Sequence, residues 1–326
     1  MKKRIRIWIY CVSIGVLLSA CGTKESDNEL KKDNYVKVEP QPVDESELEP
    51  LQGETEFQED SSQVNTESVA TQAPYEYFNT QGMTLESRIH VPEGYERTST
   101  EAGSLTKFLR TYPLKVHDSA VLLYDGSEKW NQDAHVAVFQ LPIEERDLQQ
   151  CADSVMRVYA EYYFQTEQYE KIRFHFTNGF LAEYGKWRDG YRISVEGNNV
   201  SWVKSASYDD SYETFVKFMR MVFTYAGTLS MEQESTQISV KEARVGDVIL
   251  KGGSPGHVVM IVDMCENEQG EKAFLLAQGY MPAQEFHVLK NPLHEESPWY
   301  YEAELTESIR TPEYGFGEGC LKRLSY

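Results

Sequence analysis

Positive charge is scarce in this sequence. Its 326 residues include 52 Asp and Glu but only 32 Lys and Arg, which gives a formal net charge of −20 at pH 7. A protein that binds nucleic acid needs a basic surface to neutralise the phosphates. We therefore exclude nucleic acid as a partner, and we do not expect the protein's surface to lie flat on anionic lipid.

Long apolar runs and cofactor motifs are also missing. No run after residue 20 reaches the roughly 20 apolar residues that a transmembrane helix needs. The sequence contains no phosphate-binding loop and no dinucleotide fingerprint. Two histidines, His287 and His294, are separated by VLKNPL, which fits no common metal-ligand spacing. We expect neither a metal nor a cofactor.

The N-terminus has the features of an export signal. Four basic residues among the first six precede the apolar run IWIYCVSIGVLLSA at 7–20, which is short enough for the core of a secretory signal. The run ends in LSAC at 18–21, which resembles the lipobox of bacterial lipoproteins. That resemblance implies cleavage before Cys21 and lipid on its sulfur, which would anchor the protein to the outer face of a membrane in the cell envelope. An ordinary signal peptide is the alternative.

Composition changes sharply after this signal. Residues 22–75 contain 14 Asp or Glu against four Lys, with few large apolar side chains, and such a segment cannot bury enough surface to fold. We therefore expect a signal peptide at 1–20, the lipidated cysteine and a disordered acidic linker at 21–75, and a single globular domain at 76–326.

Three of the five cysteines fall within that domain: Cys151, Cys265 and Cys320. An exported protein lies where disulfides can form, but three thiols cannot all pair within one chain. A Cys265–Cys320 disulfide is one candidate, and it would leave Cys151 as the odd thiol.

Periodicity predicts an α+β domain. We predict helices at 104–115, 145–169 and 211–229. Two strands around Asp125-Gly126 are predicted within 119–141, and a β ribbon within 172–205. Short strands of an antiparallel sheet are predicted at 247–250, 257–263, 273–278 and 285–289.

Three polar residues in this layout could form a catalytic set. Cys151 lies near the start of the 145–169 helix, where the helix dipole lowers a thiol pKa. His257 opens a strand directly after the turn GGSPG at 252–256, and Gln278 ends the next strand. Antiparallel pairing could bring the Gln278 amide to the imidazole, which gives a nucleophile, a base and an orienting group. The alternative is ordinary packing, because free cysteines are often buried.

The same pieces resemble the papain-like peptidases, in particular the NlpC/P60 and CHAP cell-wall amidases. They share a cysteine at a helix start, a strand that follows "GD" (here GDVIL, 246–250), a strand that begins "GHV" (here GHVVMIVD, 256–263), and a polar residue on the following strand. The resemblance implies a helix packed on a small antiparallel sheet, with the 172–229 ribbon and helix as an insertion. It also implies a cysteine amidase or peptidase that acts on an amide bond, for instance in peptidoglycan peptides.

A second resemblance extends over the whole domain. The segments LQQCADSVMRVYAEYYF, FTNGFLAEYGKWRDGYRI and LLAQGYMPAQEFHVLKNP are similar to an uncharacterised bacterial family catalogued as domain of unknown function 4846. This resemblance implies an exported, often lipid-anchored protein and assigns no activity.

Two aromatic residues are candidates for substrate binding. Trp130 and Tyr280 both lie in expected loops with polar neighbours, where an aromatic ring can line a groove for a cell-wall peptide or glycan. A groove of this kind also fits the other class of function. In that class the domain is a non-catalytic envelope module that binds a glycan, a peptide or a partner protein.

Overall fold

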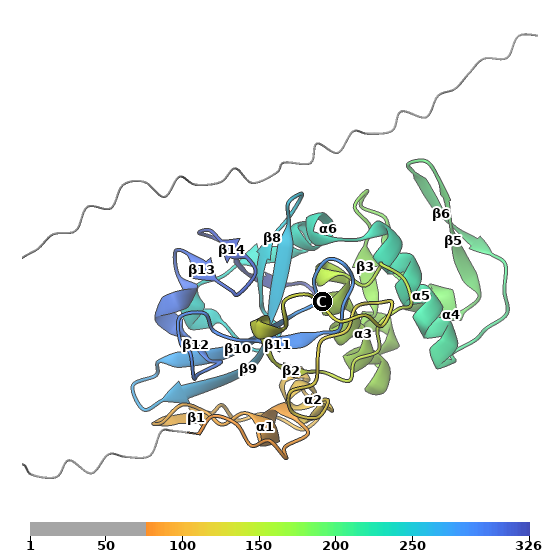
Figure 1. Cartoon of the computed structure of the whole chain (residues 1–326). Coiled ribbons are helices and arrows are strands. Elements are labelled where there is room, and N and C mark those ends of the chain that lie inside the picture. Colours follow the sequence, from red (N-terminus) through yellow and green to blue (C-terminus); the bar gives the residue numbers. More distant parts are fainter. Residues whose placement is uncertain (1–75) are drawn as a thin grey trace, which may run out of the picture. The chain divides into compact units, whose positions relative to one another are not determined.

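The computed structural model describes residues 76–326, which belong to one compact unit (Figure 1). The expected signal peptide, the lipidated Cys21 and the acidic linker lie outside the described residues. Within 76–326, no helix has both the length and the apolar character needed to cross a membrane.

The largest element is a nine-stranded sheet whose neighbouring strands are all antiparallel. Its strands are β1 (Tyr95–Arg97), β2 (His135–Val138), β7 (Ser235–Gln237), β8 (Val248–Lys251), β9 (His257–Asn267), β10 (Lys272–Gln278), β11 (His287–Leu289), β12 (Tyr300–Tyr301) and β15 (Leu321–Leu324). Their order is β2-β11-β10-β9-β8-β15-β7, while β1 also pairs with β9 and β12 with β10. The fold is therefore α+β with an antiparallel sheet, and that sheet is larger than the small one expected.

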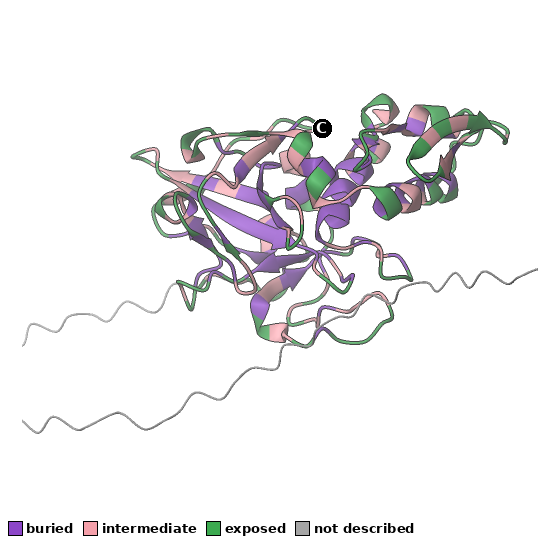
Figure 2. Ribbon diagram, turned by 90° about the horizontal axis from the view of Figure 1, so that it is seen from above, coloured by how far each residue is buried: buried purple, intermediate pink, exposed green. Residues whose placement is uncertain are grey.

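The β9–β10 hairpin forms the middle of this sheet. Its branched and aromatic side chains favour strands, and nearly all of them are buried, so both faces of the hairpin are covered (Figure 2). Pairing runs from Lys272 opposite Glu266 to Ala277 opposite Met260. The first residue of β9 and the last residue of β10 therefore lie at the same end of the hairpin.

Six α-helices lie within the described residues, and some of them pack on the large sheet while others pack on those helices. They are α1 (Leu85–Arg88), α2 (Leu105–Thr111), α3 (Cys151–Gln165), α4 (Tyr184–Arg188), α5 (Tyr212–Tyr225) and α6 (Thr228–Gln233). Helices α2 and α3 pack against β9, and α5 and α6 pack against α3. The expected helix at 145–169 thus begins only at Cys151, so this cysteine is its first residue.

Three two-stranded sheets are separate from the large sheet in their strand pairing. They are β3 (Arg173–His175) with β4 (Leu181–Glu183), β5 (Tyr191–Glu196) with β6 (Asn199–Lys204), and β13 (Ile309–Arg310) with β14 (Gly315–Phe316). The β5–β6 ribbon projects beyond α4 and α5, at the end of the domain away from the large sheet (Figures 1 and 2).

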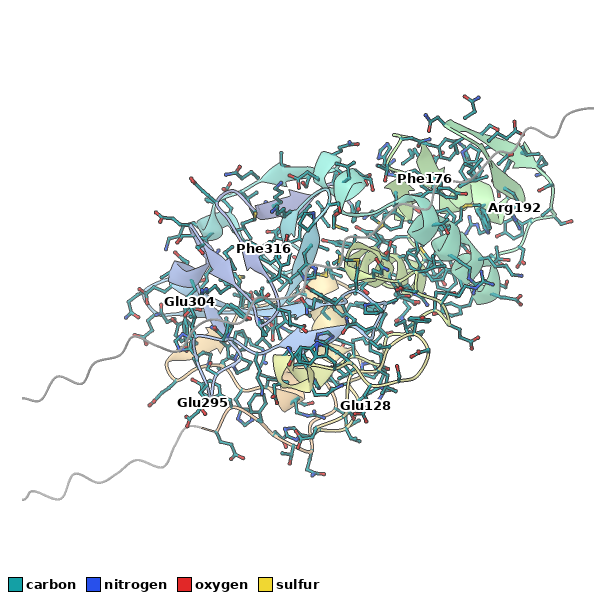
Figure 3. All side chains as sticks on the ribbon, turned by 45° about the horizontal axis from the view of Figure 1, so that its top comes forward. Glu128, Phe176, Arg192, Glu295, Glu304 and Phe316 are labelled. Atoms are coloured by element: carbon teal, nitrogen blue, oxygen red, sulfur yellow. The ribbon has the colours of Figure 1, made fainter. Side chains whose placement is uncertain are left out.

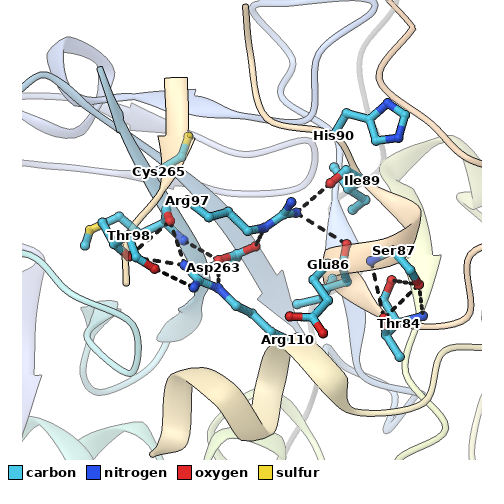
Figure 4. Close-up of polar contacts among 12 residues, drawn as sticks. Thr84, Glu86, Ser87, Ile89, His90, Arg97, Thr98, Arg110, Asp263 and Cys265 are labelled. Carbon is cyan, nitrogen blue, oxygen red and sulfur yellow. Dashed lines mark hydrogen bonds and ion pairs between the residues drawn. The ribbon is translucent and has the colours of Figure 1, made fainter. Parts of the chain in front are cut away.

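A buried ion cluster fastens the first elements to β9 (Figure 4). The Asp263 carboxylate, which is fully buried, accepts hydrogen bonds from Arg97 Nε at 2.7 Å and Arg110 Nε at 2.6 Å. Arg97 also donates to the Ile89 carbonyl at 2.5 Å, and Arg110 donates to the Thr98 carbonyl at 2.6 Å. One carboxylate of β9 therefore holds β1, α2 and the end of α1.

The candidate Cys265–Cys320 disulfide is not present, because both thiols are free. Cys265 lies on β9, and Cys320 immediately precedes β15, with β8 between these two strands in the sheet. Two strand spacings amount to roughly 9–10 Å, whereas disulfide-bonded Cα atoms lie within about 7 Å. The order of the strands therefore keeps the two cysteines apart.

Candidate functional site

The start of α3 places a thiol against the start of β9. Gln150 caps the helix, and its backbone N–H donates to Asp153 Oδ2 at 3.1 Å. Cys151 follows as the first helical residue and is only 7% exposed. The backbone N–H groups of Ala152, Val258 and Cys151 itself interact with the sulfur. Since Val258 directly follows His257, the thiol borders the strand that carries the imidazole.

The net pKa of this thiol differs from expectation. The three N–H groups, two of them at the helix start, lower the pKa. Burial has a larger effect and Asp153 adds to that effect, so the pKa of Cys151 rises to about 11. The prediction of a lowered thiol pKa is therefore wrong. At neutral pH the group is a thiol, and any attack by it requires a base.

Two glycines allow the close backbone contacts that position the His257 imidazole and the Gln278 amide. A side chain at Gly256 would lie 2.3 Å from the Gly253 carbonyl oxygen, so only glycine fits in the turn that leads into β9. Across the hairpin, a Cβ at Gly279 would lie 2.2 Å from Ser154 Oγ. The missing side chain lets the end of β10 approach the start of α3.

His257 and Gln278 are directly bonded. Their side chains are 2% and 0% exposed, and His257 Nε2 lies 2.7 Å from Gln278 Oε1. Three rings surround the imidazole, with centroids 4.7 Å away for Tyr280, 5.0 Å for Tyr314 and 5.8 Å for Phe316. Burial lowers the pKa of His257 to about 4, so its imidazole is neutral at pH 7 and able to accept a proton.

The amide of Gln278 continues into a polar network that sequence reasoning missed. Gln278 Nε2 donates to Glu313 Oε2 at 2.8 Å, and Lys129 Nζ forms an ion pair with the same oxygen at 2.6 Å. Lys129 Nζ also lies 3.4 Å from His287 Nε2. Burial lowers the pKa of Lys129 and holds that of His287 well below its usual value. No motif or periodicity marks Lys129 or Glu313 in the sequence, because both lie in irregular loops.

The candidate residues fall into two groups in the structure. Cys151, His257, Gln278 and Tyr280 gather at the junction of α3 with the β9–β10 hairpin. Trp130 lies outside this group, because its side chain is 93% exposed. Within 76–326 no hydrogen bond joins the thiol to the imidazole, although the backbone N–H of Val258, the residue after His257, lies near the sulfur.

Comparison with known families places this site within a family. The model of a domain of unknown function, number 4846, matches residues 85–323. The chain belongs to this family. The comparisons with curated proteins and with solved structures gave no match. The matched segment contains the whole of the site from Lys129 to Glu313, so the site is part of the 4846 domain.

Possible metal ligands and pockets elsewhere in the described residues bear on what the 4846 domain could bind. Among the described residues, no group of three or more His, Cys, Asp or Glu is arranged to hold a metal. A separate pocket of about 470 Å³ is lined by Trp187 and by the cations Arg192, Lys217 and Arg220. Figure 3 shows Arg192 at the ribbon end of the domain and Phe316 in the half that contains the large sheet. This pocket is therefore separate from the Cys151 site.

Because the His257 imidazole is buried, the stability of the 4846 domain should depend on pH. Because the pKa of His257 falls to about 4 from 6.5, the unfolded chain takes up a proton first as pH falls below 6.5. Stability from this residue is complete above pH 6.5 and is lost progressively down to pH 4, with a loss of about 2–3 kcal/mol by pH 4.5. Burial also lowers the pKa of His287, so this residue should likewise reduce stability as the pH falls. Urea unfolding of the full chain at pH 7.5 and 4.5 measures this loss.

A His257→Gln variant should show a smaller loss between these two pH values, because glutamine does not titrate. The exposed His90 provides the matched control, and His90→Gln should leave the difference unchanged. Equal pH dependence in wild type and His257→Gln would contradict this assignment.

Proposed function

We propose that this member of the 4846 family is a lipid-anchored cell-envelope protein with a papain-like cysteine amidase or peptidase domain. The observation that carries the proposal is the His257–Gln278 hydrogen bond, 2.7 Å long, beside the N-terminal cysteine of α3. A nucleophile at a helix start, a base and an amide that orients the base form the arrangement used for acyl transfer. The substrate would be an amide bond, for which peptidoglycan peptides are the candidate, reached from an anchor at Cys21.

The first half-reaction transfers the acyl group to sulfur. His257 removes the proton from the Cys151 thiol while the sulfur forms a bond to the amide carbon. The resulting tetrahedral intermediate breaks its C–N bond, and the imidazolium returns the proton to the departing amine. His257 then deprotonates a water molecule that attacks the thioester, which releases the carboxylic acid and restores the thiol.

The resting pair of Cys151 and His257 is uncharged, which is the state from which general-base catalysis starts. The pKa of Cys151, about 11, lies far above that of His257, about 4, so the resting pair is a neutral thiol and a neutral imidazole. Proton transfer must therefore accompany the attack. The backbone N–H groups of Cys151 and Ala152 at the start of α3 are the candidate donors to the developing oxyanion.

Substrate entry requires movement of the covering loops. The loop after β10 is held to the segment that precedes α3 because Ala283 N–H donates to Asp147 Oδ1 at 2.7 Å. The loop between β13 and β14 places the Tyr314 ring on the imidazole, and the Tyr314 hydroxyl donates to the Pro255 carbonyl at 3.4 Å. An extended peptide would have to displace the rings of Tyr280 and Tyr314 to reach the imidazole.

A non-catalytic binding module is the second candidate. Two observations favour it, namely the 7% exposure of Cys151 and the upward shift of its pKa. In that case the pocket beside Trp187 is the candidate binding place, since Arg192, Lys217 and Arg220 surround it. Its ligand would be an anionic glycan or peptide.

Hydrolysis of defined peptides distinguishes the two functions. We expect the purified full chain to release new primary amines from synthetic peptidoglycan stem peptides, detected by fluorescence and mass spectrometry. A Cys151→Ala variant should release none, and the wild type should form an acyl adduct on Cys151. Cys320→Ala removes a partly exposed thiol and should leave the rate unchanged. Binding of the peptides without cleavage, or equal cleavage by Cys151→Ala, would favour the binding module.

A further inference from the structure

The orientation of the Gln278 amide is fixed by a neighbour outside the expected triad. This amide is fully buried between two partners, with its oxygen 2.7 Å from His257 Nε2 and its nitrogen 2.8 Å from Glu313 Oε2. A carboxylate only accepts hydrogen bonds. The amide must therefore present its N–H₂ group to Glu313 and its oxygen to His257.

That orientation determines which ring nitrogen of His257 carries the proton. An amide oxygen also only accepts, so the proton of the neutral imidazole has to reside on Nε2. The lone pair then lies on Nδ1, which is the one ring nitrogen left to take the thiol proton. With the amide reversed, the proton would move to Nδ1 and the base would be blocked.

Glu313 is itself held in place by charge. Its carboxylate pairs with Lys129 Nζ at 2.6 Å, and the two side chains are 12% and 6% exposed. Asn131 Nδ2 donates to the other carboxylate oxygen at 3.4 Å, and the Tyr280 hydroxyl donates to the Glu313 carbonyl at 3.3 Å. Its neighbours in the chain, Tyr314 and Phe316, pack on the same imidazole.

We propose that Glu313 is a positioning residue of this site. Its carboxylate orients the Gln278 amide and thereby selects the His257 tautomer that has Nε2 protonated and Nδ1 free. The role of that tautomer in proton transfer rests on the proposed hydrolase function, but the tautomer itself can be observed without any turnover.

Nitrogen NMR of His257 in the full chain is the direct test. In the wild type at pH 7, Nε2 should have the shift of a protonated ring nitrogen and Nδ1 that of an unprotonated one.

In Glu313→Gln the side chain can donate as well as accept, so the Gln278 amide can reverse and the second tautomer should appear. Amide hydrolysis should then fall about 10-fold in kcat with little change in KM. The exposed Glu318 gives the control, and Glu318→Gln should change neither measurement.

A second variant covers the case in which Glu313→Gln leaves Lys129 unpaired and fails to fold. The double variant Lys129→Met with Glu313→Leu removes both charges together, and the same mixture of tautomers is expected. A single unchanged tautomer in a folded variant would overturn the role of Glu313, even if hydrolysis continued. A changed tautomer in a protein that cleaves no amide would support it while removing the proposed function.

Discussion

Replacement of His257 with alanine should lower the rate constant of amide hydrolysis at pH 7 by about a thousandfold or more. The reason lies in the pKa of Cys151, about 11. Without a base, the sulfur reacts only through the thiolate already present, which at pH 7 amounts to roughly one molecule in ten thousand. The measurement is kcat of the full chain on the stem peptides that the wild type cleaves.

The pH profiles of the two proteins should differ in shape. The wild-type rate should be level above pH 5 and fall below pH 4, because the pKa of His257 is about 4 and the protonated ring accepts no proton. The rate of His257→Ala should instead rise about tenfold per pH unit towards pH 11. Added imidazole should restore part of the lost rate by entering the space that the side chain leaves.

His175→Ala is the matched control for this experiment. His175 lies on β3 and contacts Glu234 Oε1 at 2.6 Å, so its loss should leave both the rate and the pH profile unchanged. If His257→Ala and the wild type gave the same rate and the same profile, His257 would not be the base. A peptide-binding role for the domain would then be favoured.

The contact between His257 and Gln278 could be predicted from the sequence because the two residues lie on consecutive strands. The two residues stand at the ends of strands that follow one another with a short turn between them. Antiparallel pairing of such strands brings the start of one to the end of the next. The polar residues interrupt apolar runs, so they are visible in one sequence without further information.

The neighbouring residues Glu313 and Lys129 could not be predicted from the sequence in the same way. Glu313 is 35 residues from Gln278, and it is 184 residues from Lys129. Neither residue lies in a periodic segment, and each is one of many charged residues in an acidic chain. The burial of Cys151 was hidden for a related reason. The sequence indicates that Cys151 lies near a helix start, but it does not show that residues 279–284 pack against that start.

Two errors in the predicted elements have specific physical causes. Within 119–141 the first expected strand is a loop, because the Gln132 side chain exchanges hydrogen bonds with Val121 and donates to the Lys129 carbonyl. One amide thereby satisfies backbone groups that a strand partner would otherwise take. Within 172–205 the ribbon is interrupted by α4, whose Tyr184 and Trp187 are three residues apart and both pack on Phe218.

Replacement of Asp263 with alanine should lower the free energy of unfolding by about 3–5 kcal/mol. The carboxylate is 0% exposed and is the anion shared by Arg97 and Arg110, whose side chains are 19% and 3% exposed. Its loss leaves two guanidinium groups close together with no anion between them. The attachment of α1, β1 and α2 to β9 depends on these bonds. Urea unfolding at pH 7 measures the change.

The matched control is an ion pair of the same segment that lies at the surface. Lys107 Nζ lies 3.1 Å from Glu86 Oε1, with side chains 42% and 36% exposed, and Glu86→Ala should cost less than about 1 kcal/mol because solvent screens such pairs. If Asp263→Ala cost no more than Glu86→Ala, the cluster would not hold the first elements to the sheet. A triple variant with Asp263→Leu, Arg97→Met and Arg110→Met removes all three charges at once. It should recover most of the lost stability, since the cost arises from uncompensated charge rather than from lost volume.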